Sequence, residues 1–482
     1  MRTRFITLAL LLVSWPCWAT TYYLANASTT PAGNDSNSGA SASVPWLTPN
    51  HALNCGDTII AVASTAYSAS NFQTFGTVTC SAGNNVAWLT CATFDGCKIS
   101  GLTTNQRGMS ISRSYWGVED WEVDGSATSG HCFIAQPATT TTNIHNIIFA
   151  DDIATGCGPA GFEAGNNSDA GVDYFAIVGT ITYGTAGGSV SCGSGIEIYS
   201  PVATDTLPGT HIYIAGNFSW SNKNGNPCGG TTPTDGEGIN FDTFDGSQTG
   251  GLTPYNQQAV ADNNIVLNNG GRGFEAENNL VGAPDNSHIY VRHFTSWQNN
   301  TDLNQTALCA CALGEIAGIN FNNIEMYRNI TATTAATGVN GSALYDFWAT
   351  TPTAQDLIYQ NIGWSATGTY SAKYDPGSVF SFGPGNLFGT NPQFANPVAP
   401  GAPSCSGYAN TEACMATVIA DFTPTNPAAA GYGYQVPSAM SVYDPLYPQW
   451  LCNVTNLPAG LVTPGCLVAS ATTGSVSGGT QQ

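Results

Sequence analysis

Short stretches in which apolar and polar residues alternate recur along the middle of the chain, each beginning with glycine. Such period-two alternation predicts β-strands with one apolar and one polar face. The five stretches, named glycine strands here, are Gly-Phe-Glu-Ala (161–164), Gly-Ile-Glu-Ile (195–198), Gly-Ile-Asn-Phe-Asp (238–242), Gly-Phe-Glu-Ala-Glu (273–277) and Gly-Ile-Asn-Phe-Asn (318–322). The residue after each glycine is expected to point inward: Phe162, Ile196, Ile239, Phe274 and Ile319.

A second repeated unit lies between the glycine strands and carries a polar residue at its centre. Clear copies are Ile-Ala-Gly-Asn-Phe-Ser-Trp (214–220) and Ile-Tyr-Gln-Asn-Ile-Gly-Trp (358–364). The aligned copies place their polar residues in one column, at steps of 28 to 47 residues: Asp120, Asp152, Thr180, Asn217, Asn264, His293, Asn329 and Asn361. Stacked asparagines of this kind form hydrogen-bonded ladders. His293 is expected to be a buried, hydrogen-bonded core residue.

The two units together predict the fold class. Self-similarity at tens of residues, with at least two strands per repeat, is typical of a solenoid. We therefore expect an all-β protein: a right-handed parallel β-helix solenoid with loop insertions and a Pro/Gly-rich C-terminal tail. The alternative is a β-propeller or a β-sandwich, but the spacing is irregular for blades and the paired units recur too often for a sandwich. Inserted loops usually mark the working face.

The ends of the chain differ from this repeated region. Arg2 and Arg4 precede an apolar stretch that is too short to span a bilayer, which is typical of a secretory signal peptide. The expected divisions are a signal peptide (1–19), a β-helix domain with its N-terminal cap (20–365), the C-terminal end of the β-helix with a wrapping segment (366–468) and a disordered tail (469–482). The sequence thus predicts a secreted, extracellular protein with no membrane span.

Acidic residues outnumber basic ones by far. Loss of the signal peptide removes Arg2 and Arg4 from 10 basic residues, which leaves 8 Lys and Arg against 31 Asp and Glu, a net charge of −23. This charge argues against nucleic acid and anionic membranes as partners. It also disfavours a polyanionic glycan unless Ca²⁺ bridges the two.

The cysteine count becomes even once Cys17 leaves with the signal peptide, since 14 of 15 remain. Disulfides are the expected state of cysteines in an exported chain. The simplest local pairs are Cys55–Cys80, Cys91–Cys97, Cys132–Cys157, Cys192–Cys228, Cys405–Cys414 and Cys452–Cys466. Cys309 and Cys311 are too close in sequence to reach good disulfide geometry with each other.

Both ends of the expected mature chain carry family-like motifs. Near its start are Thr-Tyr-Tyr-Leu (21–24), Gly-Asn-Asp-Ser (33–36), Pro-Trp (45–46) and Gly-Asp-Thr-Ile-Ile (56–60), and near its end are Asn-Leu-Phe-Gly-Thr-Asn-Pro-Gln-Phe (386–394) and Ala-Asp-Phe-Thr-Pro (420–424). In this order they resemble secreted right-handed parallel β-helix proteins of the pectate-lyase-like superfamily. The resemblance implies the scaffold rather than the chemistry, because this fold carries lyases, hydrolases, epimerases and adhesins.

Carboxylates gather at the outward positions of the glycine strands, although only 9% of the residues are charged. One outward column is expected to be Glu163, Glu197, Asn240, Glu275 and Asn320, and the next Gly165, Tyr199, Asp242, Glu277 and Asn322. Close to them in sequence lie Lys223, Asp235, Glu237, Asp245 and Arg272. We therefore expect an acidic groove on this sheet that binds a polysaccharide. The protein is expected to be a monomer.

Three functions are compatible with this cluster. In a glycoside hydrolase, Asp242 with Glu275 or Glu277 would be the carboxyl pair. Residues on neighbouring rungs fit the separation of about 5–5.5 Å in retaining enzymes, and a diagonal offset of one rung fits the range of roughly 6.5–9.5 Å in inverting enzymes. Crowding of the carboxylates would raise one pKa, as a general acid requires. Substrate would contact Glu197, Tyr199, Asn240 and Lys223.

In a polysaccharide lyase, Ca²⁺ would be held by Asp235, Glu237, Asp242 and Asp245 and would neutralise a uronate, while Arg272 or Lys223 removes the C5 proton. In a non-catalytic adhesin or structural protein, the same carboxylates would be a solvated face or a structural Ca²⁺ site. The chain has no Asp-Asp pair followed by Gly-His-Gly, no recognisable basic signature of the lyases and no Gly-x-Ser-x-Gly motif. The choice between lyase, hydrolase and non-enzyme therefore stays open, and Ca²⁺ is the one cofactor considered.

Overall fold

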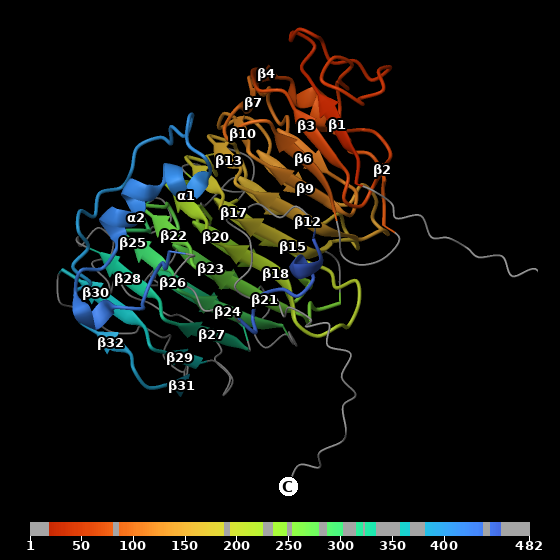
Figure 1. Ribbon diagram of the computed structural model, residues 1–482. Coiled ribbons are helices and arrows are strands. Elements are labelled where there is room, and N and C mark those ends of the chain that lie inside the picture. Colours follow the sequence, from red (N-terminus) through yellow and green to blue (C-terminus); the bar gives the residue numbers. More distant parts are fainter. Residues whose placement is uncertain are drawn as a thin grey trace, which may run out of the picture.

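The computed structural model describes residues 19–80, 86–187, 193–224, 235–247, 253–278, 287–301, 315–321, 323–333, 357–366, 381–436 and 444–454. The predicted signal peptide, apart from its last residue, and the predicted tail 469–482 lie outside these ranges. No helix among the described residues is long and apolar enough to cross a membrane. Short parallel strands dominate the described chain and stack into three long sheets (Figure 1).

The first sheet has twelve strands. In spatial order they are β1 (Thr21–Leu24), β3 (Thr58–Ala61), β6 (Ala87–Cys91), β9 (Trp116–Glu119), β12 (Ile144–Ala150), β15 (Val172–Val178), β18 (Thr210–Ala215), β21 (Gln258–Asp262), β24 (His288–Arg292), β27 (Ile324–Tyr327), β29 (Leu357–Tyr359) and β31 (Ser381–Phe382).

The second sheet has eleven strands and the third has seven. The second contains β4 (Ser64–Tyr67), β7 (Cys97–Ser100), β10 (Trp121–Asp124), β13 (Ile153–Thr155), β16 (Ile181–Tyr183), β19 (Phe218–Trp220), β22 (Ile265–Leu267), β25 (Thr295–Trp297), β28 (Ile330–Thr333), β30 (Ile362–Ser365) and β32 (Leu387–Phe388). The third contains β8 (Met109–Ile111), β11 (Phe133–Ala135), β14 (Phe162–Ala164), β17 (Ile196–Tyr199), β20 (Ile239–Asp242), β23 (Phe274–Glu277) and β26 (Ile316–Ile319).

Successive strands visit the three sheets in rotation. The chain passes through β12, β13 and β14 and returns to the first sheet as β15, which pairs with β12 in parallel. In the same way β13 pairs with β16 and β14 pairs with β17. Each coil thus adds one strand to each sheet, and the predicted parallel β-helix is confirmed. Near its first coils lie a short sheet of β2 (Leu53–Asn54) and β5 (Val78–Thr79) and the 3₁₀ turn η1 (Ala69–Phe72).

Inward side chains of all three sheets fill one continuous core. Phe133 and Phe162 stack on adjacent coils with ring centroids 4.7 Å apart, and Phe149 of the first sheet contacts both rings. All three are completely buried. Burial of a phenylalanine side chain contributes about 1.5–3 kcal/mol, so apolar stacking along the axis is a main source of stability.

The glycine that opens each glycine strand has a steric reason. A Cβ atom on Gly195 would lie 2.6 Å from the carbonyl oxygen of Gly238, and one on Gly238 would lie 2.6 Å from that of Gly273. Adjacent coils therefore approach so closely here that only glycine fits. The prediction that the next residue points inward is confirmed for Phe162, Ile196, Ile239 and Phe274, which are completely buried in the core.

The last glycine strand was placed wrongly by the sequence pattern. In β26 it is Ile316 that pairs with Phe274, and Ile319 pairs with Glu277. Ile316 is therefore the inward residue, and Ile319 belongs to an outward column. Asn320 follows the strand instead of continuing the first outward column, and Asn322 lies outside the described residues.

The asparagine ladder is confirmed. The backbone N–H of Asn217 donates to Asn264 Oδ1 at 2.9 Å, and that of Asn329 donates to Asn361 Oδ1 at 3.0 Å. All four side chains are completely buried. A second, parallel ladder, which the sequence reading missed, connects the next turn of the coils: Thr185, Asn222, Asn269 and Asn299.

Two assignments to the first ladder were wrong by one residue. Phe294, not His293, occupies the ladder position, because its N–H donates to Asn329 Oδ1 at 2.9 Å. Trp121, not Asp120, donates to Asp152 Oδ1 at 2.9 Å. Asp120 and His293 instead occupy the preceding left-handed turn position, with φ of 68° and 55°. His293 is nevertheless buried and hydrogen-bonded, as expected, through Nδ1 to Asp262 Oδ1 at 3.0 Å.

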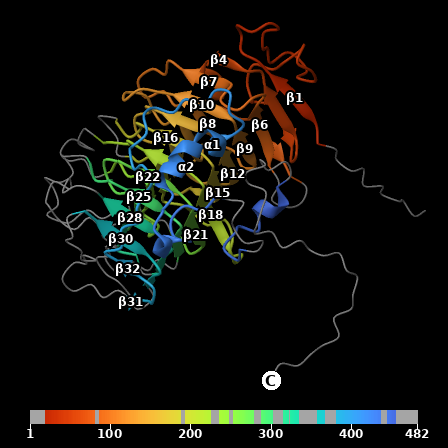
Figure 2. The same ribbon diagram turned by 60° about the vertical axis from the view of Figure 1, so that its left-hand side comes forward.

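The C-terminal part of the described chain covers the outer face of the second sheet. It forms α1 (Thr411–Cys414), α2 (Ala416–Phe422) and the 3₁₀ turn η4 (Pro427–Ala429). Phe422 packs edge-on against Trp297 of β25, with ring centroids 5.3 Å apart, and Trp220 Nε1 donates to the carbonyl of Gly401 at 3.1 Å. Figure 2 shows α1 and α2 in front of the strands of this sheet.

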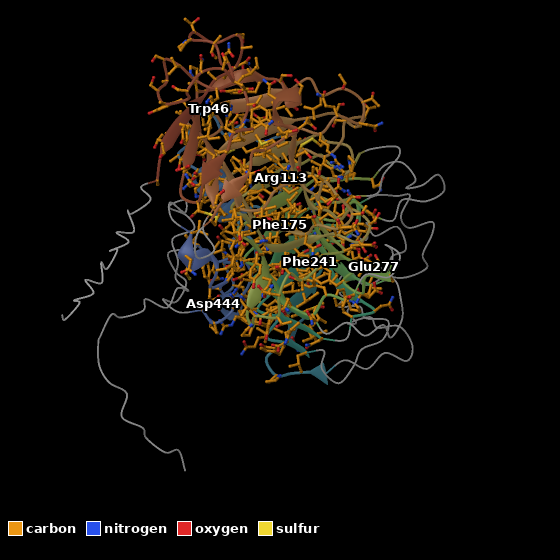
Figure 3. All side chains as sticks on the ribbon, turned by 90° about the vertical axis from the view of Figure 1, so that its right-hand side faces the viewer. Trp46, Arg113, Phe175, Phe241, Glu277 and Asp444 are labelled. Atoms are coloured by element: carbon orange, nitrogen blue, oxygen red, sulfur yellow. A yellow bond between two sulfur atoms is a disulfide. The ribbon has the colours of Figure 1, made fainter. Side chains whose placement is uncertain are left out.

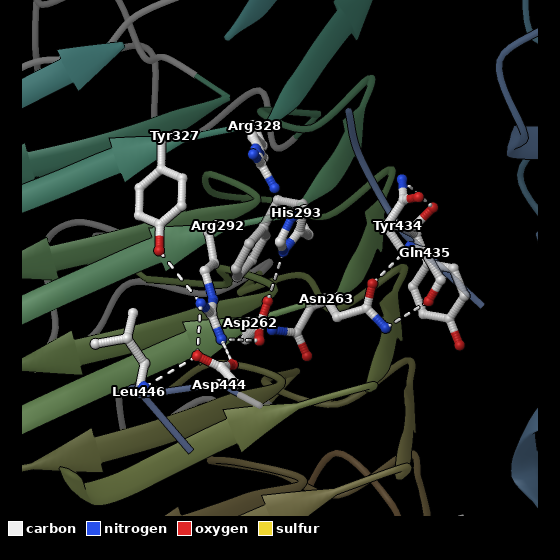
Figure 4. A network of polar contacts seen from close by, with 12 residues as sticks. Asp262, Asn263, Arg292, His293, Tyr327, Arg328, Tyr434, Gln435, Asp444 and Leu446 are labelled. Carbon is white, nitrogen blue, oxygen red and sulfur yellow. Dashed lines mark hydrogen bonds and ion pairs between the residues drawn. The ribbon is translucent and has the colours of Figure 1, made fainter. Parts of the chain in front are cut away.

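The segment 444–454, which includes η6 (Leu451–Asn453), covers the outer face of the first sheet. Tyr447 packs against Tyr213, with ring centroids 5.4 Å apart. Arg292 anchors the segment, because its guanidinium lies between Asp444 and the completely buried Asp262, 2.7 Å from the latter (Figure 4). Two of the three sheets are thus covered by the C-terminal part of the chain.

Four of the predicted disulfides are present: Cys55–Cys80, Cys91–Cys97, Cys132–Cys157 and Cys405–Cys414. Cys132–Cys157 joins adjacent coils at a Cα–Cα distance of 5.5 Å. Cys452 is also disulfide-bonded, and its predicted partner Cys466 lies outside the described residues. The predicted pair Cys192–Cys228 lies outside them too, as do Cys309 and Cys311.

Candidate functional site

The outer face of the third sheet carries two columns of side chains. Strand register stacks Glu163, Glu197, Asn240 and Glu275 in the first column. It stacks Tyr199, Asp242 and Glu277 in the second column, with Ile319 after them. Figure 3 shows Phe241, the inward neighbour of Asp242, inside the solenoid and Glu277 on the side opposite Asp444.

The two columns differ in exposure. Glu197, Asn240 and Glu275 are only 9%, 3% and 2% exposed. Tyr199, Asp242 and Glu277 end their strands and are all partly exposed. The second column is therefore the more exposed of the two, and the first column beside it on the same face is buried.

Asp242 and Glu277 are neighbours in register on adjacent strands. Burial raises the pKa of Asp242 to about 7, and the negative charge of Asp235 acts in the same direction. A hydrogen bond from Thr243 Oγ1 lowers the pKa but does not outweigh burial. Burial also raises the pKa of Glu277 to about 8, assisted by the charges of Glu275 and Asp242. At neutral pH such a pair holds a proton between two carboxyl groups, which suits general acid and base chemistry.

Asp235 lies at the centre of the carboxyl cluster. Its charge raises the pKa values of Glu197, Glu237, Asp242 and Glu277, in each case after burial. Glu197 and Glu237 are buried enough for their pKa values to lie well above the ordinary value. The residues that the sequence pattern grouped from neighbouring coils thus form one electrostatic cluster.

Arg272 is the cation within this cluster. Its guanidinium pairs with the carboxylate of Glu275, and the two side chains are 7% and 3% exposed. Although burial opposes its charge, the carboxylates of Glu275 and Glu237 raise the pKa of Arg272. A guanidinium held in this way stays protonated, so Arg272 acts as a counter-charge that positions Glu275 and does not suit the role of a base.

The residues predicted to bind a metal do not all face one point. Glu237 accepts a hydrogen bond from Ser194 Oγ at 2.9 Å and contacts Glu275. Asp245 Oδ1 accepts from the N–H and the hydroxyl of Ser247, at 3.0 and 2.7 Å, within its own turn. The carboxylate oxygens of the predicted residues are ligands of the kind that Ca²⁺ prefers, but the group of described acidic residues whose oxygens lie close enough together to hold an ion is Glu119, Asp120 and Asp151.

Lys223 is exposed, and its ammonium group makes no ion pair with these carboxylates among the described residues. It therefore gives no support to a lysine base. Of the residues predicted to bind substrate, Glu197 and Asn240 are buried. Tyr199 has a partly exposed ring beside Asp242.

The sequence reading missed the first two strands of this sheet, β8 and β11. Gly-Met-Ser-Ile (108–111) carries the same glycine signature and could have been found. It also missed His131, which precedes β11 and pairs with Glu163 on the next coil. This pair extends the polar surface of the third sheet toward the N-terminal coils.

A separate group of carboxylates lies at the corner between the first and second sheets. Ligand oxygens of Glu119, Asp120 and Asp151 all lie within 4.8 Å of one another, so these residues could hold a metal ion. Burial raises the pKa values of Glu119 and Asp120 to about 7 and about 8. Asp151 also accepts a hydrogen bond from the N–H of Thr411 at 3.1 Å, which ties α1 to this corner.

No protein-family model matches the chain, and no curated protein matches it. Among solved structures it is similar to a rhamnogalacturonan lyase (13% identity, 78% of this chain and 90% of that chain, TM-score 0.42). It is also similar to the A-module of a mannuronan C-5 epimerase of Azotobacter vinelandii (10% identity, 69% and 86%, TM-score 0.39). A pectate lyase aligns with 14% identity over 78% of this chain and 83% of that chain, with a TM-score of 0.34.

These TM-scores are all below 0.5. The assignment of the fold rests instead on three parallel sheets, on one strand per sheet in each coil and on the asparagine ladders. On these grounds the chain has the parallel β-helix fold that its resemblance to the pectate-lyase-like superfamily implies.

Proposed function

We propose that this protein is a carbohydrate-active enzyme, a glycoside hydrolase that cleaves a polysaccharide with Asp242 and Glu277 as its carboxyl pair. The observation that carries the proposal is their position: they lie in register on adjacent strands and are the partly exposed carboxyl groups of the two outward columns. Adjacent strands lie about 4.8 Å apart. This spacing fits the separation of about 5–5.5 Å in retaining hydrolases.

The two carboxyl groups differ in the role that suits each. Glu277 has the higher pKa, about 8, and is the general acid that protonates the leaving oxygen. Asp242, with a pKa of about 7, loses its proton first and is the nucleophile. Thr243 Oγ1 donates to Asp242 Oδ1 at 2.5 Å and orients that carboxylate.

A sugar ring stacks on Tyr199, which lies next to Asp242 in the same column. Aromatic side chains combine a large apolar surface with a polar end, which suits the mixed character of a sugar. A polymer that follows the column runs along the solenoid axis and crosses several coils. The disulfides are compatible with action outside the cell, where the predicted signal peptide would direct the chain.

A lyase needs a base that removes the C5 proton, and the two residues considered for this role fit it poorly. Arg272 is buried and paired with Glu275, so its guanidinium keeps its proton. Lys223 is exposed and makes no ion pair with these carboxylates within the described ranges. Hydrolysis therefore has more support than β-elimination.

The test is to incubate the purified protein with a panel of neutral, amino-sugar and acidic polysaccharides, with Ca²⁺ and then with a chelator. Reducing ends and ultraviolet absorbance are measured together. We expect reducing ends without absorbance, retention of anomeric configuration by NMR, and a loss of about 10³-fold or more in rate for Asp242→Asn and Glu277→Gln. Asp169→Asn, an exposed carboxylate in a loop, is the matched control that keeps full activity.

Absorbing, unsaturated products that vanish with the chelator would replace the hydrolase by a Ca²⁺-dependent lyase. Full activity of either pair variant would remove that residue from the mechanism. Failure to act on any member of a broad panel would leave a non-catalytic binding or structural protein as the better explanation.

A further inference from the structure

We propose that the polysaccharide bound at this site carries free amino groups, so that protonated hexosamine units bind the acidic columns of the third sheet. This inference rests on the proposed function and names its substrate class. It follows from the kind of polar atoms at the site, from their pairing and from the charge of the whole chain.

Carboxyl groups are the most frequent polar groups of the two columns: Glu163, Glu197, Asp242, Glu275 and Glu277. Asn240 lies between Glu197 and Glu275 in the first column, and it is directed outward because Ile239 and Phe241 on either side point into the core. Its Oδ1 atom is buried and has no hydrogen-bond partner. A buried acceptor without a partner is costly, so this atom indicates a ligand that donates. An ammonium group donates three hydrogen bonds and accepts none.

The basic groups of this sheet already have partners. Arg272 pairs with Glu275, and His131 pairs with Glu163. The charges of Asp235, Glu275 and Asp245 all add negative potential at the carboxyl group of Asp242. A cation supplied by the substrate would complete the charge balance at this point.

A uronate polymer would meet the opposite situation, because each of its carboxylates would approach carboxyl groups of the same sign. A polycation is also attracted from a distance, since the chain carries 31 acidic residues against 10 basic ones. The same charge that disfavours a polyanion thus favours an amino-sugar polymer.

Binding of ammonium groups has a proton signature. Asp242 and Glu277, with pKa values of about 7 and about 8, hold protons at neutral pH. A nearby positive charge favours their ionised forms and lowers both pKa values, so the complex releases protons between about pH 6 and 8. A neutral sugar lacks that charge and does not displace these protons.

The experiment is isothermal titration calorimetry on the mature protein at pH 7, in two buffers of different ionisation enthalpy. The ligands are a β-1,4-linked glucosamine hexamer, its fully N-acetylated form and an oligogalacturonate of equal length. We expect the glucosamine hexamer to bind at least about tenfold more tightly than the acetylated form, with release of roughly one proton and weakening by salt.

Asp242→Asn should reduce both the affinity for the glucosamine hexamer and the proton release, while Asp169→Asn leaves both unchanged. Circular dichroism before titration confirms that each variant is folded. A further arm titrates Ca²⁺ alone and then repeats the three sugars with Ca²⁺ present.

Equal affinity for the acetylated hexamer, together with cleavage that depends on Asp242, would overturn this inference and leave the proposed hydrolase intact. Tighter binding of oligogalacturonate, with or without Ca²⁺, would also overturn it. If no sugar binds and no reducing ends appear, the inference and the proposed function fail together.

Discussion

Replacement of Asp242 by asparagine should make the protein more stable at alkaline pH. The side chain keeps its shape, and the amide oxygen can still accept the hydrogen bond from Thr243. The folded carboxyl has a pKa of about 7, against an ordinary value of 3.8 for an aspartate. Each pKa unit corresponds to about 1.36 kcal/mol, so ionisation of this buried group costs the folded state about 4 kcal/mol at pH 8.

The sign follows from the raised pKa. Between about pH 4 and 7 the folded chain binds more protons at Asp242 than the unfolded chain. The contribution of Asp242 to the free energy of unfolding is therefore greatest below about pH 4 and is lost as the pH rises through about 7. Asp242→Asn should therefore raise the free energy of unfolding by up to about 4 kcal/mol at pH 8 and by less than about 1 kcal/mol at pH 4.

The assay is guanidinium denaturation followed by far-ultraviolet circular dichroism at pH 4, 6 and 8. Asp169→Asn, an exposed carboxylate, should change stability by less than about 0.5 kcal/mol at each pH. If Asp242→Asn gives no gain at pH 8, or the same gain at pH 4 and pH 8, burial and crowding do not raise this pKa. Asp242 would then be ionised at neutral pH and would not share a proton with Glu277. A gain in stability together with a loss of cleavage is the expected combination for a functional carboxyl group.

Two further predictions concern the scaffold. Asn264→Ala should cost about 2–4 kcal/mol in denaturation experiments, because it leaves the buried N–H of Asn217 and the carbonyl of Ile214 without their partner at 2.9 and 3.0 Å. Asp444→Ala should loosen the C-terminal segment by about 1–3 kcal/mol, because Arg292 loses one of its two carboxylates, and limited proteolysis should then cut this segment several-fold faster.

Matched exposed residues serve as controls for both variants. Asn50→Ala and Asp169→Ala should change stability by less than about 0.5 kcal/mol. A ladder variant as stable as Asn50→Ala would mean that the buried groups find other partners. Unchanged cleavage of Asp444→Ala would mean that apolar contacts alone hold the segment in place.

The parts of the fold that could be predicted from the sequence are those in which stacking repeats the same requirement on every coil. Gly195 and Gly238 repeat because each must allow the carbonyl of the next coil within 2.6 Å of its missing Cβ. Asn217 and Asn264 repeat because the Oδ1 atom of each accepts a hydrogen bond from a backbone N–H of the preceding coil. A steric or hydrogen-bonding requirement that recurs on every coil therefore selects the same residue type at the same position of each repeat.

The errors lie where another residue meets the same demand. Phe294 can occupy the ladder because its backbone N–H still donates to Asn329 Oδ1. Its apolar side chain hid the position, and the alignment therefore chose the neighbouring polar residue, His293. Glu315 stands where earlier coils have glycine, and its carboxylate accepts hydrogen bonds from Ser296 and Asn299 at 2.7 and 2.6 Å. The first substitution depends on a residue of the next coil, and the second on residues 19 and 16 positions earlier in the chain, so a local pattern shows neither.

The sequence predicted which residues form the site but not which of them are buried. Glu275 and Glu277 belong to one alternating strand and look equivalent in sequence, yet Glu275 is buried with Arg272 while Glu277 is partly exposed. Burial depends on what covers each position, and alternation reports only which face of the sheet a residue occupies. For the same reason the ion pair between His131 and Glu163, from different coils, had no local signal.

The return of the C-terminal segment along the two sheets changes how this solenoid assembles. In a simple repeat array each coil depends only on its neighbours, so coils can form and fray one at a time. Here Asp151 receives a bond from a residue 260 positions later, and Thr210 donates to one 236 positions later. Closure of such long loops is slow, because the entropy is lost before the contacts form.

The consequence is an order of events during folding. The early coils can pair as they emerge, but their apolar outer faces stay open to water and to other chains until the last hundred or so residues arrive. Completion is then a single step that joins early and late coils into one cooperative unit. Before that step the chain is most prone to aggregate, because its apolar outer faces are exposed. Docking of the C-terminal segment covers these faces and completes the fold.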